Sequence, residues 1–433
     1  MGRKETSEVF MNLGKYSFGV GDRFGKQGKA QLAAMVEAGK VGVEVTPVWN
    51  KSHREHTIIG TKPAMVRAEA DEAVKAKDWG GHYFVDADHI NLKNVDLFIK
   101  SSDFFTLDVA DYIGQAPSTG SGQAAWKEDV DNFINGCAKY IDGLSVPGIE
   151  GNLIVTEDSV RAIANKYLWA VKEASRLYSH IVPKKGVGNF VVEMSMDETD
   201  TPQSPVELFF ILAAVAQEEM PVKTIAPKFS GRFNKGVDYV GNVERFAREF
   251  EQDLAVIAYA VEEFGLPKNL KLSVHSGSDK FSIYGAINKA LRKFDAGLHV
   301  KTAGTTWLEE LAGLAIAEGE GLRIAKHIYA EAFSRMDELT KPYATVIDID
   351  KGRLPSPEVV AEWNGRRFAE TLRHDQSCGR YNPDLRQLLH VGYRVAAEMG
   401  REFTDAVTDC ERIIGPNVTE NIYQRHIKPI FID

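Results

Sequence analysis

The chain is poor in cysteine and has no long hydrophobic run. Its 433 residues include three cysteines, Cys137, Cys378 and Cys410, which lie far apart and lack CxxC spacing. This excludes a disulfide-stapled secreted domain and predicts free thiols in a reducing compartment. No apolar run approaches the roughly 18 residues that span a bilayer, and residues 1–10 lack the apolar core of a signal peptide. We therefore expect a cytoplasmic protein with no membrane partner.

Positive charge is also scarce. The 52 Lys and Arg residues stand against 61 Asp and Glu residues, which gives a formal net charge of −9. Because no basic cluster is interleaved with aromatic residues, we expect no nucleic-acid partner. No P-loop occurs, and Gly19, Gly21 and Gly25 have GxGxxxG spacing instead of the GxGxxG of a dinucleotide turn. The sequence therefore predicts a small-molecule enzyme that uses no nucleotide cofactor.

Short strand-like segments alternate with helical ones along most of the chain. Each strand candidate is rich in Val, Ile, Phe or Tyr and ends near Gly, Asp, Ser or Thr. The eight candidates are Tyr16–Val20, Val41–Val48, His82–Asp86, Phe104–Val109, Phe190–Met196, Val222–Phe229, Leu270–Val274 and Leu298–Thr302. This alternation predicts an α/β fold, most simply a (β/α)8 TIM-type barrel. An open doubly wound sheet is the rival, and it usually needs a Gly-rich phosphate turn.

Two parts of the chain exceed what such a barrel needs. Between the fourth and fifth strands, residues 110–188 contain two helix candidates, Gln123–Ile141 and Glu157–Ile181, which predict a helical insertion. The end of the chain also has mostly helical patterns. We expect a catalytic barrel over residues 1–330, insertion included, and a helical C-terminal extension over residues 331–433 that packs on it.

Three histidines each follow a short apolar run: His89, His275 and His299. A parallel barrel exposes side chains at the carboxyl ends of its strands, and neutral imidazole is the commonest metal ligand. Acidic residues arrive at strand ends in the same way, namely Asp86, Asp88, Asp197 and Glu198. Together they predict a divalent-metal site, although the DADH segment could equally be a helix-capping loop.

The segment EMSMDETDTPQSP places four acids within eight residues, from Glu193 to Asp200. Like charges that converge in a pocket raise one another's pKa unless a cation offsets them. We expect Glu198 to be an acid/base group; the alternative is a solvated acidic turn that caps the next helix. Which of Asp86, Asp88, Asp197 and Glu198 also ligates a metal stays open, and Asp86 and Asp197 are candidate substrate contacts.

Two loops have the character of anion sites at helix starts. One follows the seventh strand and the other follows the eighth, where barrels often bind phosphate. Their candidate substrate-binding residues are Ser276, Ser278, Asp279 and Lys280 in the first loop, and Gly304 and Thr305 in the second. The alternative for each loop is a plain helix cap. Either loop could receive a carboxylate as well as a phosphate.

Three basic residues near strand ends complete the candidate set. Arg23, in GVGDRFG, could clamp a carboxylate with two hydrogen bonds. Lys228 and Lys301 follow apolar runs, where a lysine is either a charged substrate contact or a Schiff-base nucleophile. We favour the charge role and keep the Schiff base as an alternative.

These segments resemble the bacterial tagaturonate epimerase family. The matching motifs are GVGDRFG, DADH, SMDETDTPQSP, HSGSDKFSIY, HVKTAGTTWLE and RQLLHVGY, which span residues 18–393. The resemblance implies a barrel enzyme that interconverts D-tagaturonate and D-fructuronate with a divalent cation. It further implies His89, His275 and His299 as ligands, Asp88 as proton acceptor and Glu198 as proton donor.

The chemistry of these two sugar acids is consistent with that residue set. They differ at a carbon β to the ketone, which simple enolisation does not invert. Retro-aldol cleavage and re-addition would invert it, with a metal stabilising the enediolate and Asp88 and Glu198 exchanging protons. Transient oxidation by a nicotinamide is the other route, but no dinucleotide motif is present.

Two other functions stay open from the sequence. One is a barrel aldolase or isomerase that acts on a phosphorylated ketose through a Schiff-base lysine. The other is a non-catalytic sugar-acid binding protein that uses the anion loops alone. Three imidazoles suit Zn, Ni, Mn, Co or Fe, so the metal is not identified, and the sequence leaves open whether the chain forms a homo-oligomer.

Overall fold

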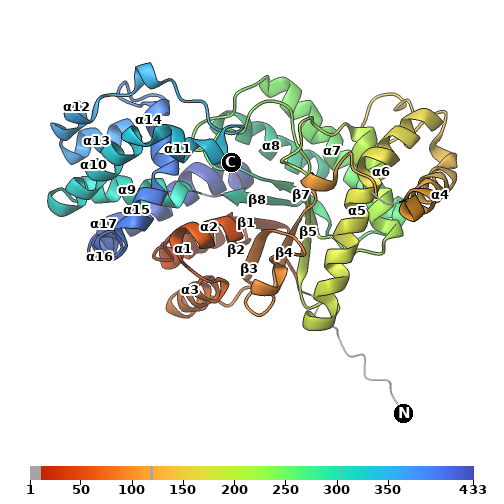
Figure 1. The fold of residues 1–433 in the computed structure, drawn as a ribbon, viewed down its shortest axis with the longest axis horizontal. Coiled ribbons are helices and arrows are strands. Elements are labelled where there is room, and N and C mark those ends of the chain that lie inside the picture. Colours follow the sequence, from red (N-terminus) through yellow and green to blue (C-terminus); the bar gives the residue numbers. More distant parts are fainter. Residues whose placement is uncertain (1–10, 118–119, 303) are drawn as a thin grey trace, which may run out of the picture.

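The computed structural model describes residues 11–117, 120–302 and 304–433, with backbone only for residues 120–124. Eight parallel strands close into a barrel in the order β1 to β8 (Figure 1). The strands are β1 (Tyr16–Val20), β2 (Val45–Ser52), β3 (Phe84–Ile90), β4 (Phe104–Asp108), β5 (Val191–Ser195), β6 (Thr224–Ala226), β7 (Lys271–Val274) and β8 (Leu298–Thr302). The predicted barrel is confirmed.

Helices surround this barrel and connect its strands. They are α1 (Gly28–Lys40), α2 (His53–Ile59), α3 (Pro63–Ala76), α4 (Gly120–Gly136), α5 (Glu157–Lys185), α6 (Pro205–Gln217), α7 (Val243–Phe264) and α8 (Phe281–Phe294). Local chemistry sets several ends: the Ser204 and Asn242 side chains accept hydrogen bonds from backbone amides at the starts of α6 and α7. Gly265, at φ 66°, ends α7 in the left-handed conformation.

Strand boundaries differ from the sequence expectation mainly at β2 and β3. The second strand begins at Val45, because residues 41–44 form the turn out of α1, with Gly42 at φ 83°. The third strand continues past Asp86 to Ile90. This extension places Asp88 and His89 within β3, where Asp88 pairs with Ser52 of β2.

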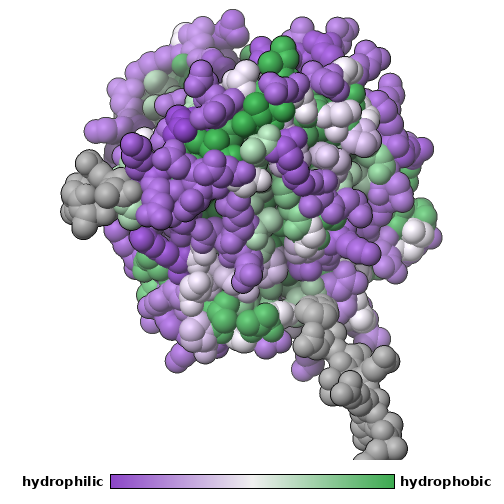
Figure 2. All heavy atoms as spheres, turned by 90° about the vertical axis from the view of Figure 1, so that its right-hand side faces the viewer, coloured by the Kyte–Doolittle hydropathy of each residue, from purple (hydrophilic) through white to green (hydrophobic). Residues whose placement is uncertain are grey.

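The segment between β4 and β5 contains both expected helices. The long helix α5 packs against α6 and β4, which is the position of the barrel helix that follows β4. The helix α4 packs on the outside of α5 and is the additional element, at the right-hand edge of Figure 1. The face that these helices present is largely hydrophilic, with hydrophobic groups in small separate areas (Figure 2).

The chain after β8 is helical. Its helices are α9 (Thr305–Ile316), α10 (Gly319–Ser334), α11 (Met336–Thr340), α12 (Pro357–Ala361), α13 (Gly365–Leu372), α14 (Pro383–Val391), α15 (Tyr393–Met399), α16 (Arg401–Asp409), α17 (Glu411–Glu420) and a final π-helix, Asn421–Ile432. Of these, α17 packs on α1 and α9, and the π-helix packs on α8 and α1. The division at residue 330 stays a prediction.

The barrel interior is apolar at one end and polar at the other. Val48, Phe84, Phe104 and Val191 form a small cluster with Leu13 near the strand starts. Barrels usually fill the next layers with branched apolar side chains. Here the next layers hold buried polar side chains: Ser17, Asp86, Thr106, Glu193, Thr224, Ser273, His299 and Lys301. An interior this polar indicates that the barrel itself forms part of a functional site.

Among the described residues, no helix combines the length and the apolar character that a membrane crossing requires. The three cysteines are free thiols, as expected, and Cys137 is buried.

The loop between β7 and α8 does not form the predicted anion site. Asp279 is fully buried, and both of its carboxylate oxygens accept hydrogen bonds from Arg386 Nη2 at 3.1 Å. Lys280 is also buried and donates to the carbonyl oxygens of Asn234, Val237 and Ser278. The prediction of Asp279 and Lys280 as substrate contacts is corrected on these grounds, because Asp279 attaches α14 to the barrel and Lys280 attaches the loop after β6. The prediction for Ser278 stays a prediction.

The Asp279–Arg386 pair yields a stability prediction. Removing one partner of a buried ion pair leaves the other charge uncompensated, which costs roughly 3–5 kcal/mol. We expect Arg386→Met to lower the free energy of unfolding by about that amount, measured by urea denaturation. Arg366→Met is the matched control, since that side chain is 85% exposed and its pair with Glu370 is screened by water. Equal effects of the two substitutions would contradict this role of Arg386.

Candidate functional site

Three side chains meet at the carboxyl ends of β3, β5 and β7. His89 is the penultimate residue of β3, Asp197 follows β5 by two residues, and His275 directly follows β7. His89 has φ 52°, and the pairing register between β3 and β4 shifts at the same point. A left-handed conformation is unusual for histidine, and here the shifted register accompanies it. The backbone at the end of β3 therefore gives the His89 side chain a direction that a regular strand would not.

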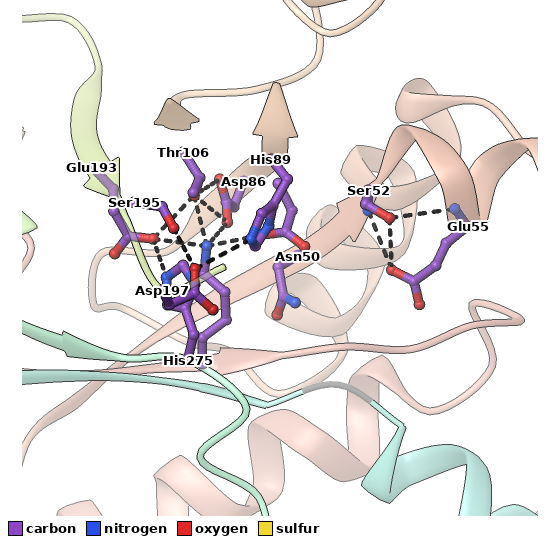
Figure 3. A network of polar contacts seen from close by, with 12 residues as sticks. Asn50, Ser52, Glu55, Asp86, His89, Thr106, Glu193, Ser195, Asp197 and His275 are labelled. Atoms are coloured by element: carbon purple, nitrogen blue, oxygen red, sulfur yellow. Dashed lines mark hydrogen bonds and ion pairs between the residues drawn. The ribbon is translucent and has the colours of Figure 1, made fainter. Parts of the chain in front are cut away.

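Figure 3 shows these side chains directed toward one another. One ligand atom from each of His89, Asp197 and His275 lies within 4.8 Å of the other two. Asp197 Oδ1 is 3.1 Å from His275 Nδ1 and 3.7 Å from His89 Nε2. Both of these nitrogens are buried and lack a well-directed hydrogen bond. Two imidazole nitrogens and a carboxylate oxygen thus converge on one point, as the ligands of a metal ion do.

The opposite nitrogen of each imidazole contacts a buried carboxylate. His89 Nδ1 is 2.8 Å from Asp88 Oδ1, and His275 Nε2 is 2.8 Å from Glu193 Oε1. A ligating histidine usually donates its other ring N–H to a carboxylate, which fixes the tautomer and the ring orientation. Both histidines have this arrangement. Their free nitrogens are therefore the ones that face Asp197.

The acidic surroundings favour a positive charge at both rings. Burial lowers the pKa of His89, but Asp88 and Asp197 outweigh it and hold that pKa well above its usual range. For His275, burial likewise lowers the pKa, while Asp197 and Glu193 raise it, to about 9 overall. A metal ion at this point would replace those protons as the compensating charge.

Lys301 lies beneath this cluster inside the barrel. Its Nζ is 2.8 Å from Asp86, 2.9 Å from Asp88 and 2.8 Å from Glu193, and it donates to Thr106 Oγ1 at 2.6 Å. Burial opposes the charge of this ammonium, but the carboxylates hold the pKa of Lys301 well above its usual range. The lysine is therefore a protonated counter-ion, which is the opposite of the neutral amine that a Schiff base requires.

His299 does not join this group. It is the second residue of β8, where its Nδ1 is 2.9 Å from Ser17 Oγ and its ring packs on Phe104 with centroids 5.3 Å apart. Burial lowers its pKa to about 3. Among the described residues, the group with metal-site geometry contains Asp197 instead of His299. The expected third histidine ligand is corrected accordingly, because its strand position places it deeper in the barrel than the strand ends.

A pocket of about 340 Å³ opens above the cluster. Asp197 and His275 form part of its wall, and Glu198 lies beside them with an exposed side chain. Ser276 and Lys228 also line it, as the sequence analysis expected for substrate contacts. The pocket thus brings two of the metal-site candidates, Asp197 and His275, and the candidate acid/base group Glu198 to one space, and its size suits a small molecule.

Arg23 lies outside this pocket lining and is buried. Its Nη1 donates to Glu55 Oε1 at 2.7 Å, and its guanidinium stacks 3.7 Å above the Tyr393 ring. Glu55 also completes the hydrogen-bonded cap at the start of α2 with Ser52. The predicted carboxylate clamp is therefore corrected: the charge of Arg23 is already paired within the protein.

The second predicted anion loop is covered by the C-terminal helices. Thr305 is 2% exposed and donates to Asn421 Oδ1 at 3.1 Å. A Cβ atom at Gly304 would lie 2.3 Å from His390 Nε2, so this position has no room for a larger residue. Gly304 and Thr305 therefore serve helix packing, which corrects their assignment to substrate binding.

Sequence reasoning missed three basic residues of the pocket, Arg54, Arg232 and Lys235. Arg54 lies on α2 and Lys235 lies in the loop after β6. The signal for Lys235 was its place in a loop at the carboxyl end of a barrel strand, where catalytic-face residues gather. For Arg54, the KSHREHT segment gave no sign that its helix reaches the pocket.

The fold and sequence were compared with known proteins. The sequence model of the tagaturonate epimerase family matches residues 5–407. A tagaturonate/fructuronate epimerase from Thermotoga maritima is 28% identical over 390 residues, which cover 87% of this chain and 72% of the relative.

Two crystal structures of a fructuronate-tagaturonate epimerase, UxaE from Cohnella laeviribosi, have the same fold. The glycerol complex has a TM-score of 0.78 at 22% identity and covers 96% of this chain and 81% of its own. The native structure has a TM-score of 0.77 at 23% identity, with 98% and 83% covered. The family match extends over nearly the whole chain, and this protein therefore belongs to the tagaturonate epimerase family of isomerases.

Proposed function

We propose that this protein is a metal-dependent epimerase that interconverts D-tagaturonate and D-fructuronate. Family membership supports the substrate pair. One observation supports the metal: two buried imidazole nitrogens without hydrogen bonds face a single carboxylate oxygen, that of Asp197.

His89, Asp197 and His275 are the residues that would hold the ion. A set of two imidazoles and one carboxylate suits Zn, Ni, Mn, Co or Fe better than Ca or Mg, which prefer oxygen ligands. When bound, a divalent cation polarises a ketone and stabilises the enediolate that carbon–carbon cleavage leaves behind.

The two sugar acids differ only in the configuration at C4, two carbons from the C2 ketone. We propose that the C4 hydroxyl loses its proton while the C3–C4 bond breaks, so that C4 becomes an aldehyde. The electron pair of that bond passes to the C2–C3 enediolate. The aldehyde then turns, the bond re-forms on its other face, and the C4 oxygen regains a proton.

Glu198 is the proposed carrier of that proton. Its side chain is exposed beside Asp197 in the pocket, and no described residue forms an ion pair with it. Asp88, the proton acceptor that the family resemblance implies, is instead engaged by both His89 and Lys301. These contacts favour a role for Asp88 in orienting the His89 ring, with proton exchange at Glu198.

The contacts of the two lysines speak against the aldolase alternative. Lys301 is surrounded by three carboxylates, and Lys228 donates to the Thr199 carbonyl oxygen. An attacking amine must instead be neutral and free. We therefore expect no borohydride-trapped adduct of a ketose substrate at Lys301 or Lys228.

The first test removes the metal. A chelator should abolish epimerisation of both uronates, followed by NMR, and one of the five candidate metals should restore it. Tightly bound NAD in the purified protein, or full activity after chelation, would contradict the proposal.

Metal binding itself gives an independent measurement. An ion that binds only the folded state raises the melting temperature with its concentration. We expect that rise to disappear in His275→Ala and Asp197→Asn. His327→Gln is the control, since His327 is exposed on α10, away from the cluster. A rise that survives in His275→Ala would place the ion elsewhere.

A pair of substitutions separates proton transfer from ring orientation. Glu198→Gln should abolish turnover while metal affinity and uronate binding persist, which would also exclude a non-catalytic binding protein.

Asp88→Asn should lower metal affinity by roughly 10- to 100-fold, because the partner of a ligating histidine is lost. If Asp88→Asn kept its metal affinity and still lost turnover, Asp88 would be the proton acceptor that the family resemblance implies.

A further inference from the structure

The pocket above the cluster contains four basic side chains: Arg54, Lys228, Arg232 and Lys235. The charged groups of two of these side chains already contact other groups of the protein. Arg232 Nη1 is 2.9 Å from Asp348 Oδ2, and Lys228 donates to the carbonyl oxygen of Thr199. Among the described residues, neither Lys228 nor Lys235 nor Arg54 has an ion-pair partner. The charged group of Lys228 is directed at a backbone carbonyl, whereas those of Lys235 and Arg54 are not, so we take the latter two as available to a bound molecule.

Lys235 is held in place but not neutralised. Its backbone amide donates to the Val346 carbonyl oxygen at 2.8 Å, and its Nζ donates to Ser276 Oγ at 2.7 Å. Burial lowers the pKa of this ammonium, although Asp197 and Glu198 partly compensate. For a half-buried cation whose nearest side-chain partner is a hydroxyl, an anion that joins it is favourable. An ammonium of this kind is suited to an anionic ligand.

Arg54 lines the same pocket and is exposed. It lies on α2, and its guanidinium is 5.5 Å from the centroid of the Tyr343 ring. Tyr343 is itself fixed by a hydrogen bond of 2.8 Å to Tyr393. The guanidinium keeps its hydrogen-bond donors available for a carboxylate.

We propose that Lys235, with Arg54, binds the C6 carboxylate of the ketohexuronate and thereby selects sugar acids over neutral sugars. The inference rests on the proposed function and identifies the residues that recognise its substrate. Ser276, the partner of Lys235, is adjacent in sequence to His275, so the carboxylate site borders the ion cluster. The ketone end and the carboxylate end of one six-carbon acid can therefore be bound at once.

This assignment gives the carboxylate site a part in the reaction. When the C3–C4 bond breaks, carbons 4–6 become an aldehyde that still bears the C6 carboxylate. An ion pair at Lys235 retains this fragment, while rotation about the C4–C5 bond presents the other face of the aldehyde. The same carbon–carbon bond then re-forms with inverted configuration at C4. Lys235 is in this sense a specificity-determining and a retaining residue.

The test compares uronates with the ketohexoses D-tagatose and D-fructose, in which CH2OH replaces the carboxylate. We expect Lys235→Met to raise KM for both uronates by roughly 10- to 100-fold, as the loss of a charged hydrogen bond implies. The ratio of kcat/KM between uronate and ketohexose should fall by the same factor. Turnover by Lys235→Met should also release free three-carbon fragments, because the ion pair that retains them is lost. Arg232→Met is the matched control from the same pocket, and we expect a much smaller change there because Asp348 already pairs with Arg232.

Two outcomes bear on the inference in different ways. If the wild-type protein epimerises uronates and Lys235→Met leaves their KM unchanged, the carboxylate lies elsewhere and the inference is wrong. If the wild-type protein leaves both uronates unconverted, the proposed function fails. In that case, calorimetric binding of D-fructuronate that is lost in Lys235→Met and kept in Arg232→Met would still support the carboxylate site.

Discussion

The ammonium of Lys301 inside the barrel is the interaction on which the site depends. A barrel interior is an apolar environment in which isolated carboxylates are expensive, yet Asp86, Asp88 and Glu193 all lie in it. Lys301 is within 2.9 Å of each of them. Two of these carboxylates then fix the two imidazoles, so the direction of both His89 and His275 follows from the charge of one lysine.

The charges around Lys301 also explain why the point where His89, Asp197 and His275 converge suits a metal. Asp197 adds a fourth carboxylate to the three that face Lys301, so negative charge exceeds positive charge at the mouth of the barrel. Protonation compensates part of the excess, since burial raises the pKa of Asp86 to about 7 and the histidines favour their charged forms. A divalent cation compensates it without those protons, and metal binding is thereby coupled to proton release.

The sequence predicted the parts of this arrangement that depend on local pattern. Strand periodicity and strand ends located the barrel, and His89 and His275 do lie at its carboxyl end. What failed depended on distant partners. Asp279 and Arg23 were predicted as substrate contacts from their loops, but Arg386 lies 107 residues from Asp279, and Glu55 lies on a helix beyond the next strand. His299 failed for another reason: the predicted strand, Leu298–Thr302, has the observed bounds, and His299 is its second residue, so it was wrongly counted among the residues at strand ends.

The distribution of charge further determines how a sugar acid can enter. The mouth of the barrel is acidic, while Lys235 and Arg54 lie on the pocket walls above it. We expect a substrate carboxylate to be repelled from the first region and attracted to the second. Under the proposed function, the ketone, which has no net charge, is therefore the end that we expect to reach the imidazoles. In this way the field of the pocket orients the substrate before any contact specific to its hydroxyl groups is made.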